Sequence, residues 1–423
     1  MLLNEMFFNI VKKQIYETLK KAFIECPYYA KNYQITLPVF DEFTYEYFSS
    51  IPLLEKKTVL KYPEEFLNDY SDRNTIVTET TSGSEGIPLL CYKSKNEKLL
   101  YSIDLWKMRK KIISDLNPKD RFVHFYVLRR RNDEKLTDAV IYENNILHLP
   151  LFDLSPEKLI IYWNEILKFQ PRWMHGIPST IYNLAVVVRE YKLPRYLFDF
   201  IELTGEYLDQ QKVNVIKEVF KCKIANQYGA REFWLLAYGC NNNILHINDK
   251  NVFIEEVFNS EFGHSELVVT SLQNQTWPLI RYRLGDIGEI GLNNCSCSIN
   301  SQFILNLNWG RESEYCTFGK FRFSKVFFSY IIRKLNDNNA GIIQYQIIKQ
   351  DEDKIQINIV GDKKSEKKVF QTFRDEFSQR QIFIDIDICY SSYIEPNNQT
   401  GKTKEFIDLT KSQQRYLYEV GGD

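Results

Sequence analysis

The stretch Thr80-Thr81-Ser82-Gly83-Ser84-Glu85-Gly86-Ile87-Pro88 lies inside residues 75–93, between two segments that alternate as strands do. Hydroxyl side chains beside glycines allow successive backbone N–H groups to form a concave nest that grips phosphate oxygens. The stretch is not a Walker A loop, because no Gly-Lys-Ser/Thr follows and the next element is expected to be a strand. Taken alone, the stretch favours an ordinary turn, because Ser/Gly clusters usually mark turns.

The composition around this stretch is typical of soluble globular proteins. The chain has 423 residues, which is too long for one ordinary core and predicts at least two structural units. It has 54 basic and 55 acidic side chains, so a nucleic-acid partner is not expected. No apolar run is long enough to cross a membrane, and the amphipathic N-terminal segment has the wrong charge order for a signal peptide. We therefore expect a cytoplasmic protein, whose cysteines would be reduced.

The hydrophobic pattern predicts an α/β protein. Residues 1–70 are expected to be helical and irregular. A helix should begin after Ser155 and run to about Phe169, and another after Asp209 to about Phe220, because Ser and Asp are favoured caps. Further strands are predicted at 252–258, 265–272, 342–349, 354–360 and 383–390, and further helices at 326–335 and 366–379. The segments after 311 form a compact βαβ-type unit of about domain size.

The first stretch resembles the phosphate loop of the adenylate-forming superfamily, which includes acyl-CoA synthetases, peptide synthetase adenylation domains and luciferase. The closer resemblance is to the branch of phenylacetate-CoA ligase, coenzyme F390 synthetase and CapK-type capsule proteins. Further segments resemble that family's motifs in the same order, across most of residues 75–406: His175–Ser179, Thr204–Glu206, Gln227–Glu232, Pro278–Asp286, Gly310-Arg311 and Gly401-Lys402. An ordered series is far more specific than any one motif.

The resemblance implies a two-domain organisation. Residues 1–311 would be a large, multi-subdomain N-terminal adenylation domain that binds ATP and an acid. Residues 312–423 would be a small, mobile α+β domain that carries the catalytic lysine, Lys402, with a hinge near Arg311–Glu314. Glu85 departs from the family pattern, in which a hydroxyl residue is usual, and its effect in the loop stays open.

The resemblance also implies roles for individual residues. Glu232 would be catalytic through Mg²⁺, because its carboxylate offers a hard oxygen. Asp286 could accept hydrogen bonds from both ribose hydroxyls, Arg311 could fork onto ribose or phosphate oxygens, and Lys402 would stabilise charge at the α-phosphate. The implied ATP-binding residues are Thr81, Ser82, Gly83, Ser84, Gly86, Thr204, Gly205, Glu206, Tyr228, Gly229, Asp286 and Arg311. The implied acid pocket includes His175, Pro178 and Ala230.

Two cysteine-containing pairs predict a metal site. Cys240 and His246 form one pair and Cys295 and Cys297 the other, on either side of the Asp286 motif. Three thiolates and one imidazole suit tetrahedral Zn²⁺, and four protein ligands would make the ion structural. The alternative is four unrelated residues, since buried free cysteine is common.

The remaining histidines, His124, His148 and His264, show no partner in the sequence and are assigned structural roles. Arg129-Arg130-Arg131 is interpreted as a solvated charge run rather than a CoA phosphate contact.

The expected activity is adenylation of a small carboxylic acid, including an aromatic one, followed by transfer to CoA. Two alternatives keep the adenylation step: AMP transfer to a phenolic hydroxyl, and amide or ester ligation in polysaccharide or natural-product biosynthesis. A degenerate nucleotide-binding or zinc-stabilised scaffold is the non-enzymatic alternative. The sequence leaves the acid, the acceptor and the oligomeric state open; resembling ligases are often homodimers.

Overall fold

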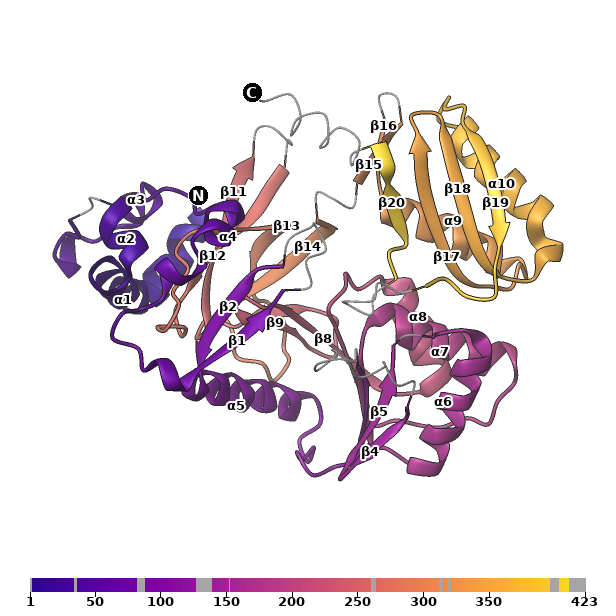
Figure 1. Ribbon diagram of the computed structural model, residues 1–423, viewed down its shortest axis with the longest axis horizontal. Coiled ribbons are helices and arrows are strands. Elements are labelled where there is room, and N and C mark those ends of the chain that lie inside the picture. The colour runs from indigo at the N-terminus through magenta and orange to yellow at the C-terminus, as the bar shows by residue number, and fades with distance from the viewer. Residues whose placement is uncertain are drawn as a thin grey trace. The chain divides into compact units, whose positions relative to one another are not determined.

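The chain folds into two compact units (Figure 1). The computed structural model describes residues 2–33, 36–81, 88–126, 139–151, 153–259, 264–311, 315–318, 321–395 and 403–410. Unit 1 comprises Met1–Pro118 and Ala225–Glu312, and unit 2 comprises Lys119–Ile224 and Ser313–Asp423. Among the described helices, none is long and apolar enough to cross a membrane.

Unit 1 combines N-terminal helices with antiparallel strands. Its helices are α1 (Leu2–Glu25), α2 (Pro27–Asn32), α3 (Tyr45–Ser49), α4 (Lys56–Lys61) and α5 (Lys95–Ile112), with 3₁₀ turns at Phe40–Glu42, Pro63–Phe66 and Arg73–Thr75. Its strands are β1 (Ile76–Thr80), β2 (Leu90–Ser94), β8 (Lys223–Ala230), β9 (Trp234–Gly239), β10 (Leu245–Ile247), β11 (Val252–Asn259), β12 (His264–Ser271), β13 (Tyr282–Leu292) and β14 (Phe303–Arg311). The predicted strands at 252–258 and 265–272 are thus confirmed.

The larger sheet of unit 1 runs in the order β11-β12-β13-β14-β10-β9-β8. Helix α1 packs on it through one apolar face, as the amphipathic pattern predicts, and Figure 1 shows α1 beside β11 and β12. Phe7 stacks on Phe303 with ring centroids 4.6 Å apart and meets Phe253 edge-on at 5.0 Å. This aromatic contact fixes the N-terminal helix to strands β11 and β14, which lie far along the chain.

Strands β1 and β2 form a separate antiparallel hairpin in which Thr80 pairs with Leu90. Helix α5 follows at once, and Ser94 and Glu97 form a reciprocal capping box at its N-terminus. Glu97 Oε1 also accepts the backbone N–H groups of Gln275 and Thr276, at 2.7 and 3.0 Å. One buried carboxylate therefore fixes the hairpin to the loop before β13.

Unit 2 contains the remaining elements. They are β3 (Phe122–Tyr126), β4 (Ile141–Glu143), β5 (Ile146–Pro150), α6 (Pro156–Phe169), β6 (Trp173–Gly176), α7 (Pro178–Glu190), β7 (Phe200–Thr204), α8 (Gln210–Phe220), β15 (Tyr315–Phe318), β16 (Phe321–Ser324), α9 (Lys325–Asp337), β17 (Ile342–Asp351), β18 (Lys354–Gly361), a 3₁₀ turn (Lys363–Ser365), α10 (Glu366–Ser378), β19 (Asp385–Tyr390) and β20 (Phe406–Asp408). The predicted caps are confirmed: Ser155 Oγ accepts from the N–H of Lys158, and Asp209 from that of Gln211.

The strands of the first part of unit 2 run in the order β7-β6-β3-β5-β4, parallel except for β4. Their alternate residues, such as Val123, Leu147 and Met174, are fully buried in one cluster with the apolar residues of α6, α7 and α8. The side chains between them therefore point to the opposite face of these strands, because successive residues of a strand alternate.

The later part of unit 2 is a four-stranded sheet in the order β19-β18-β17-β20. Helix α10 connects the parallel strands β18 and β19, so the predicted βαβ-type arrangement is confirmed. Ile331 and Leu335 of α9 and Phe373 of α10 share a core with Ile355 and Ile357 of β18. The two helices therefore bury their apolar faces against this sheet.

Candidate functional site

The hairpin of β1 and β2 carries the predicted phosphate loop. Thr81 and Leu89, on the two sides of the loop, are joined by two hydrogen bonds. The Thr81 N–H donates to Leu89 O at 2.9 Å, and Thr81 Oγ1 accepts from the Leu89 N–H at 2.8 Å. The other predicted loop residues lie outside the described residues: Ser82, Gly83, Ser84 and Gly86, together with Glu85. What the structure describes is therefore the base of this loop.

Glu79 at that base is surrounded by donors. Its carboxylate accepts from Lys98 Nζ and from Trp234 Nε1, each at 2.9 Å, and lies 3.7 Å from Lys93 Nζ. Burial works to raise the pKa of Glu79, but Lys98, Lys93 and Trp234 outweigh it and the pKa is lowered. Glu79 is therefore held as a carboxylate at the hairpin that leads into the loop.

Glu232 lies in the turn between β8 and β9. Its side chain is buried, and Oε1 accepts from the Tyr282 hydroxyl at 3.2 Å. Gly229 is required before this turn, because a Cβ at that position would lie 2.0 Å from the carbonyl oxygen of Trp234. Tyr282 was not singled out in the sequence, although it stands inside the predicted Asp286 motif.

Tyr228 and Asp286, both predicted to bind nucleotide, are in direct contact. The Tyr228 hydroxyl donates to Asp286 Oδ2 at 2.5 Å. Gly285, just before Asp286, has a φ of +82°, a backbone conformation that glycine adopts without steric cost. Asp286 also pairs in register with Arg311 on β14, so the backbones of these two predicted residues lie side by side. Strands β8, β13 and β14 thus bring three predicted residues together.

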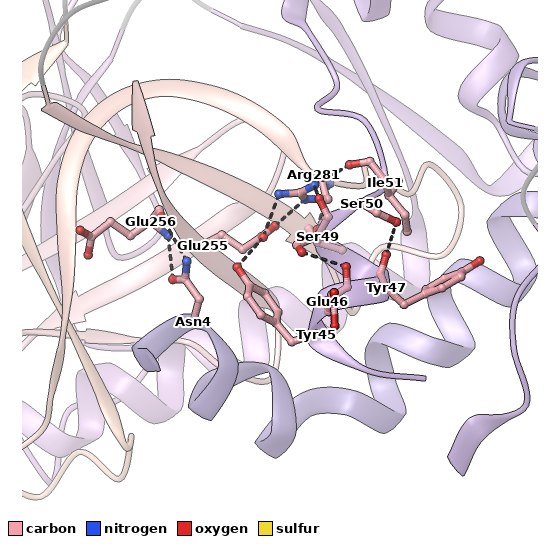
Figure 2. Close-up of polar contacts among 11 residues, drawn as sticks. Asn4, Tyr45, Glu46, Tyr47, Ser49, Ser50, Ile51, Glu255, Glu256 and Arg281 are labelled. Carbon is pink, nitrogen blue, oxygen red and sulfur yellow. Dashed lines mark hydrogen bonds and ion pairs between the residues drawn. The ribbon is translucent and has the colours of Figure 1, made fainter. Parts of the chain in front are cut away.

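A buried ionic network fixes the start of β13 (Figure 2). Arg281 Nε and Nη2 donate to the two carboxylate oxygens of Glu255 at 3.0 and 3.1 Å. Arg281 Nη1 donates to the carbonyl oxygens of Ser49 and Ile51, and the Tyr45 hydroxyl donates to Glu255 at 3.2 Å. Arg281 therefore connects the N-terminal helical segment to strand β11, which carries Glu255, and to the start of β13. It also sets the position of the adjacent Tyr282.

The predicted metal ligands converge. The donor atoms of Cys240, His246, Cys295 and Cys297 all lie within 4.8 Å of one another. Cys240 Sγ and Cys295 Sγ are 3.8 Å apart, and Cys297 Sγ is 3.2 Å from His246 Nε2. Zn–S bonds of about 2.3 Å in a tetrahedron place two sulfur atoms about 3.8 Å apart. The four side chains could therefore hold a metal ion, as the spacing of the two pairs predicted.

In unit 2 the predicted pocket and adenine-side residues meet at the N-terminus of α7. Glu206 accepts from Ser179 N–H and from Ser179 Oγ, each at 3.0 Å, beside Pro178 at the first turn of the helix. A carboxylate at this end of a helix satisfies backbone donors that otherwise lack partners. Gly205 has a φ of +86°, which allows the chain to turn from Thr204 into Glu206.

His175 is part of a row of polar side chains that the sequence did not reveal. Its Nδ1 lies 2.8 Å from the carboxylate of the fully buried Glu202. His124 pairs in register with both His175 and His148, with ring centroids 5.6 and 5.7 Å away. The sequence shows no partner for His124 or His148, but the structure places His124 beside both His148 and His175, because equivalent positions on adjacent parallel strands point to the same face. Burial, and then the neighbouring imidazoles, lower the pKa of His124 to about 3.

The predicted catalytic lysine, Lys402, lies outside the described residues, as does the run Arg129-Arg130-Arg131. Three residues after Lys402, Glu405 forms an ion pair with the buried Lys212 of α8. Burial works to lower the pKa of Lys212, but Glu405 and Glu206 outweigh it and raise the pKa. The segment 403–410 is thus anchored to the helix that follows the Thr204–Glu206 turn.

Comparison with known proteins gives one distant sequence relative. The chain is 28% identical to the protein CapK of Staphylococcus aureus over 159 residues, which cover 34% of this chain and 32% of CapK. The matched stretch therefore spans about a third of the length of that curated relative. No protein-family model matches the chain.

Solved structures give a broader likeness. A 2-hydroxyisobutyryl-CoA ligase in complex with 2-HIB-AMP matches with a TM-score of 0.69 and 15% identity, over 97% of this chain and 91% of that one. The anthranilate CoA ligase AuaEII in complex with anthranoyl-AMP matches with a TM-score of 0.51 and 12% identity, over 82% of this chain and 69% of that one. At such identities the likeness shows a shared mixed α/β fold over most of the chain.

Proposed function

Because this chain has the fold of the adenylate-forming superfamily and is a distant homologue of CapK, we propose that it is an ATP-dependent enzyme that adenylates a small carboxylic acid. The acid's carboxylate attacks the α-phosphorus of ATP, forming an acyl-AMP and expelling pyrophosphate. An acceptor then attacks the acyl carbon and releases AMP; in the leading version the acceptor is the CoA thiol. The observation that carries the proposal is the fold shared with a ligase solved with an acyl-adenylate.

Unit 1 supplies side chains suited to the nucleotide. Asp286, oriented by the Tyr228 hydroxyl, would accept hydrogen bonds from ribose hydroxyls, which suits a carboxylate because it can accept about four. Glu232 gives up one acceptor site to Tyr282 and keeps others for Mg²⁺, which, when bound, would neutralise charge on the phosphates. Arg311 would act on ribose or phosphate oxygens. In unit 2, His175 and Pro178 would contribute to the acid pocket, with Thr204, Gly205 and Glu206 on the adenine side.

The lysine and the domain organisation are part of the same proposal. Residues 1–311 would bind ATP and acid, and residues 312–423 would bring Lys402 to the α-phosphate. There its ammonium would stabilise the charge that concentrates in the transition state. Rotation about a hinge near Arg311–Glu314 would allow one site to serve both adenylation and transfer.

We also propose that the ion held by the cysteine and histidine quartet is structural Zn²⁺. The donor set, three thiols and one imidazole, is the observation that supports zinc over a hard cation. The purified protein should contain about one equivalent of zinc by elemental analysis. Replacement of Cys240 by Ser should release the metal and lower the melting temperature, without a direct effect on the affinity for ATP. A full metal content in this variant would contradict the assignment.

The proposed activity is tested by pyrophosphate release across a panel of aryl, hydroxy and fatty acids, with and without CoA. One or more acids should support release, and CoA should then yield a thioester. Release with a phenol in place of an acid would favour AMP transfer to a hydroxyl instead. AMP formation that depends on an amine or a sugar hydroxyl would favour amide or ester ligation.

Two variants assign the chemistry to this site. Lys402→Ala should abolish pyrophosphate release while leaving ATP binding intact, and Asp286→Ala should weaken ATP binding itself. Normal pyrophosphate release by the Lys402 variant would refute the role of that lysine. The absence of release with every acid and phenol would favour a scaffold.

A further inference from the structure

Lys93 is a buried cation, and neither the sequence motifs nor the fold explains why a lysine is buried at this position. Its side chain, on β2, is 1% exposed. Lysine is almost never buried to this extent unless it is paired. Burial lowers the pKa of Lys93, whereas the neighbouring Cys91, Glu79 and Glu232 act in the opposite direction. A well-packed apolar residue at such a position is often as stabilising or more so, so stability alone does not explain a lysine there.

The contacts of Lys93 link two parts of the proposed site. Its Nζ donates to the carbonyl oxygen of Arg231 at 2.5 Å, in the turn that carries Glu232. The same Nζ lies 3.7 Å from Glu79 Oε2. Glu79 pairs in register with Cys91, so Glu79 and Lys93 share one face of the hairpin that leads into the phosphate loop. One ammonium group thus joins the base of the loop to the backbone beside Glu232.

We propose that Lys93 is a positioning residue, which holds the turn bearing Glu232 in fixed register with the base of the phosphate loop. The proposal deepens the proposed function, on which it rests, because Glu232 and the loop must act on the same nucleotide. Lys93 acts through the Arg231 carbonyl and Glu79, not by touching the nucleotide. Its loss would let the carboxylate and the loop move independently, and misplacement of about 1 Å can cost roughly 100-fold in rate.

Lys98 offers a matched control for Lys93. It donates to the same Glu79 carboxylate, at 2.9 Å, but its side chain is 43% exposed and, in the described part of the chain, it makes no hydrogen bond to the Arg231 backbone. Lys93→Met and Lys98→Met therefore each remove one positive charge from Glu79. Only the first also removes the hydrogen bond to the turn. Lys93→Met should still fold, because Glu79 keeps Lys98 and Trp234 as partners.

The first experiment follows amide hydrogen exchange in peptides that cover residues 228–236, and needs no substrate. In this turn the Phe233 N–H donates to Ala230 O at 3.0 Å in the wild type. Lys93→Met should speed exchange of the turn about 10-fold or more, and Lys98→Met should leave it unchanged. Unchanged exchange in Lys93→Met overturns the proposal, whatever the protein's activity. If Lys93→Met does not fold, Lys93→Gln, which removes the charge but keeps a shorter donor, takes its place with the same criterion.

The second experiment measures the dependence of pyrophosphate release on Mg²⁺. Lys93→Met should lower kcat roughly 10- to 100-fold and raise the Mg²⁺ concentration for half-maximal activity, with little change in KM for the acid. In a Glu232→Gln background the same substitution should add little, because the group that Lys93 positions is already gone. Additive effects would overturn the positioning role. If the wild type releases no pyrophosphate while the exchange result holds, the proposed function fails and the link between hairpin and turn stands.

Discussion

Two glutamate–cation pairs in unit 1 have opposite characters. Glu255 and Arg281 are sealed: their side chains are 0% and 7% exposed, and the guanidinium satisfies backbone carbonyls as well as both carboxylate oxygens (Figure 2). Glu79 is 13% exposed and lies beside two lysines, Lys93, which is 1% exposed, and Lys98, which is 43% exposed. Burial raises the pKa of Glu255 against the opposing effect of Arg281, whereas the lysines and Trp234 lower that of Glu79.

The difference indicates a division of labour. The Arg281 pair is buried and its partners are groups of the protein itself, so we interpret it as fixing β11, β13 and the N-terminal segment. The Glu79 pair lies at the base of a loop that we propose to bind phosphates. Because Glu79 has more than one donor, Lys93 can also donate to the carbonyl oxygen of Arg231. Both pairs join a glutamate to a cation; the burial of each pair, the type of cation and the neighbouring carbonyl groups decide what each one does.

The largest effect is expected from breaking the sealed pair. Arg281→Met should lower the free energy of unfolding by about 3–5 kcal/mol, because it leaves the Glu255 carboxylate buried without its cation. Arg283→Met, two residues on, should cost only about 1 kcal/mol, because that side chain is 29% exposed. Urea denaturation measures both. Equal losses in the two variants would show that burial does not distinguish them.

A smaller effect is expected at Tyr282, which follows Arg281 in the chain and contacts Glu232 of the proposed site. Tyr282→Phe removes the hydroxyl that donates to Glu232 and should lower the free energy of unfolding by about 1 kcal/mol. The same variant should also slow pyrophosphate release, and by more than the small loss of folded protein would explain, since Glu232 loses the donor that orients it. Phe is the matched change because it keeps the ring. A variant with unaltered kinetics would separate Tyr282 from the proposed function.

The two pairs should also differ in the sign of their pH dependence. Because the pKa of Glu79 is lowered on folding, its stabilising contribution is present above the unfolded value of about 4.3 and is lost as the pH falls through the folded pKa. The stability difference between wild type and Glu79→Gln should therefore shrink in acid. For Glu255, whose pKa is raised, the contribution is present below the unfolded value and is lost as the pH rises. Denaturation curves from pH 3 to 7 give both differences, and slopes of the same sign would contradict this contrast.

The smallest effect is expected from the solvent-facing lysine. Lys98→Met should change the free energy of unfolding by no more than about 0.5 kcal/mol, since exposed ion pairs contribute little and Glu79 keeps other donors. Thermal unfolding at low and high salt checks this. A loss comparable to that of Arg281→Met would mean that Glu79, too, depends on one cation.

Much of the fold could be predicted because its signals are local. Ser155 and Asp209 each begin a helix through a side-chain oxygen that accepts an N–H two or three residues later. Likewise, residues 252–258 were predicted as a strand from the local sequence, and they form most of β11. The convergence of the three cysteines and His246 was also predictable, because thiol and imidazole side chains form a recognisable donor set even when the two pairs are far apart in the sequence.

The sequence by itself determined the order of the motifs, the helix caps and the strand segments. It also determined which three cysteines and which histidine form one donor set. The tertiary structure alone decided which groups meet: Lys93 with the carbonyl of Arg231, Arg281 with Glu255 and the carbonyls of Ser49 and Ile51, and three imidazoles in one row. The physical reason is that periodicity and capping act between near neighbours in the chain. By contrast, register between strands and the partner of a buried charge depend on how distant segments pack.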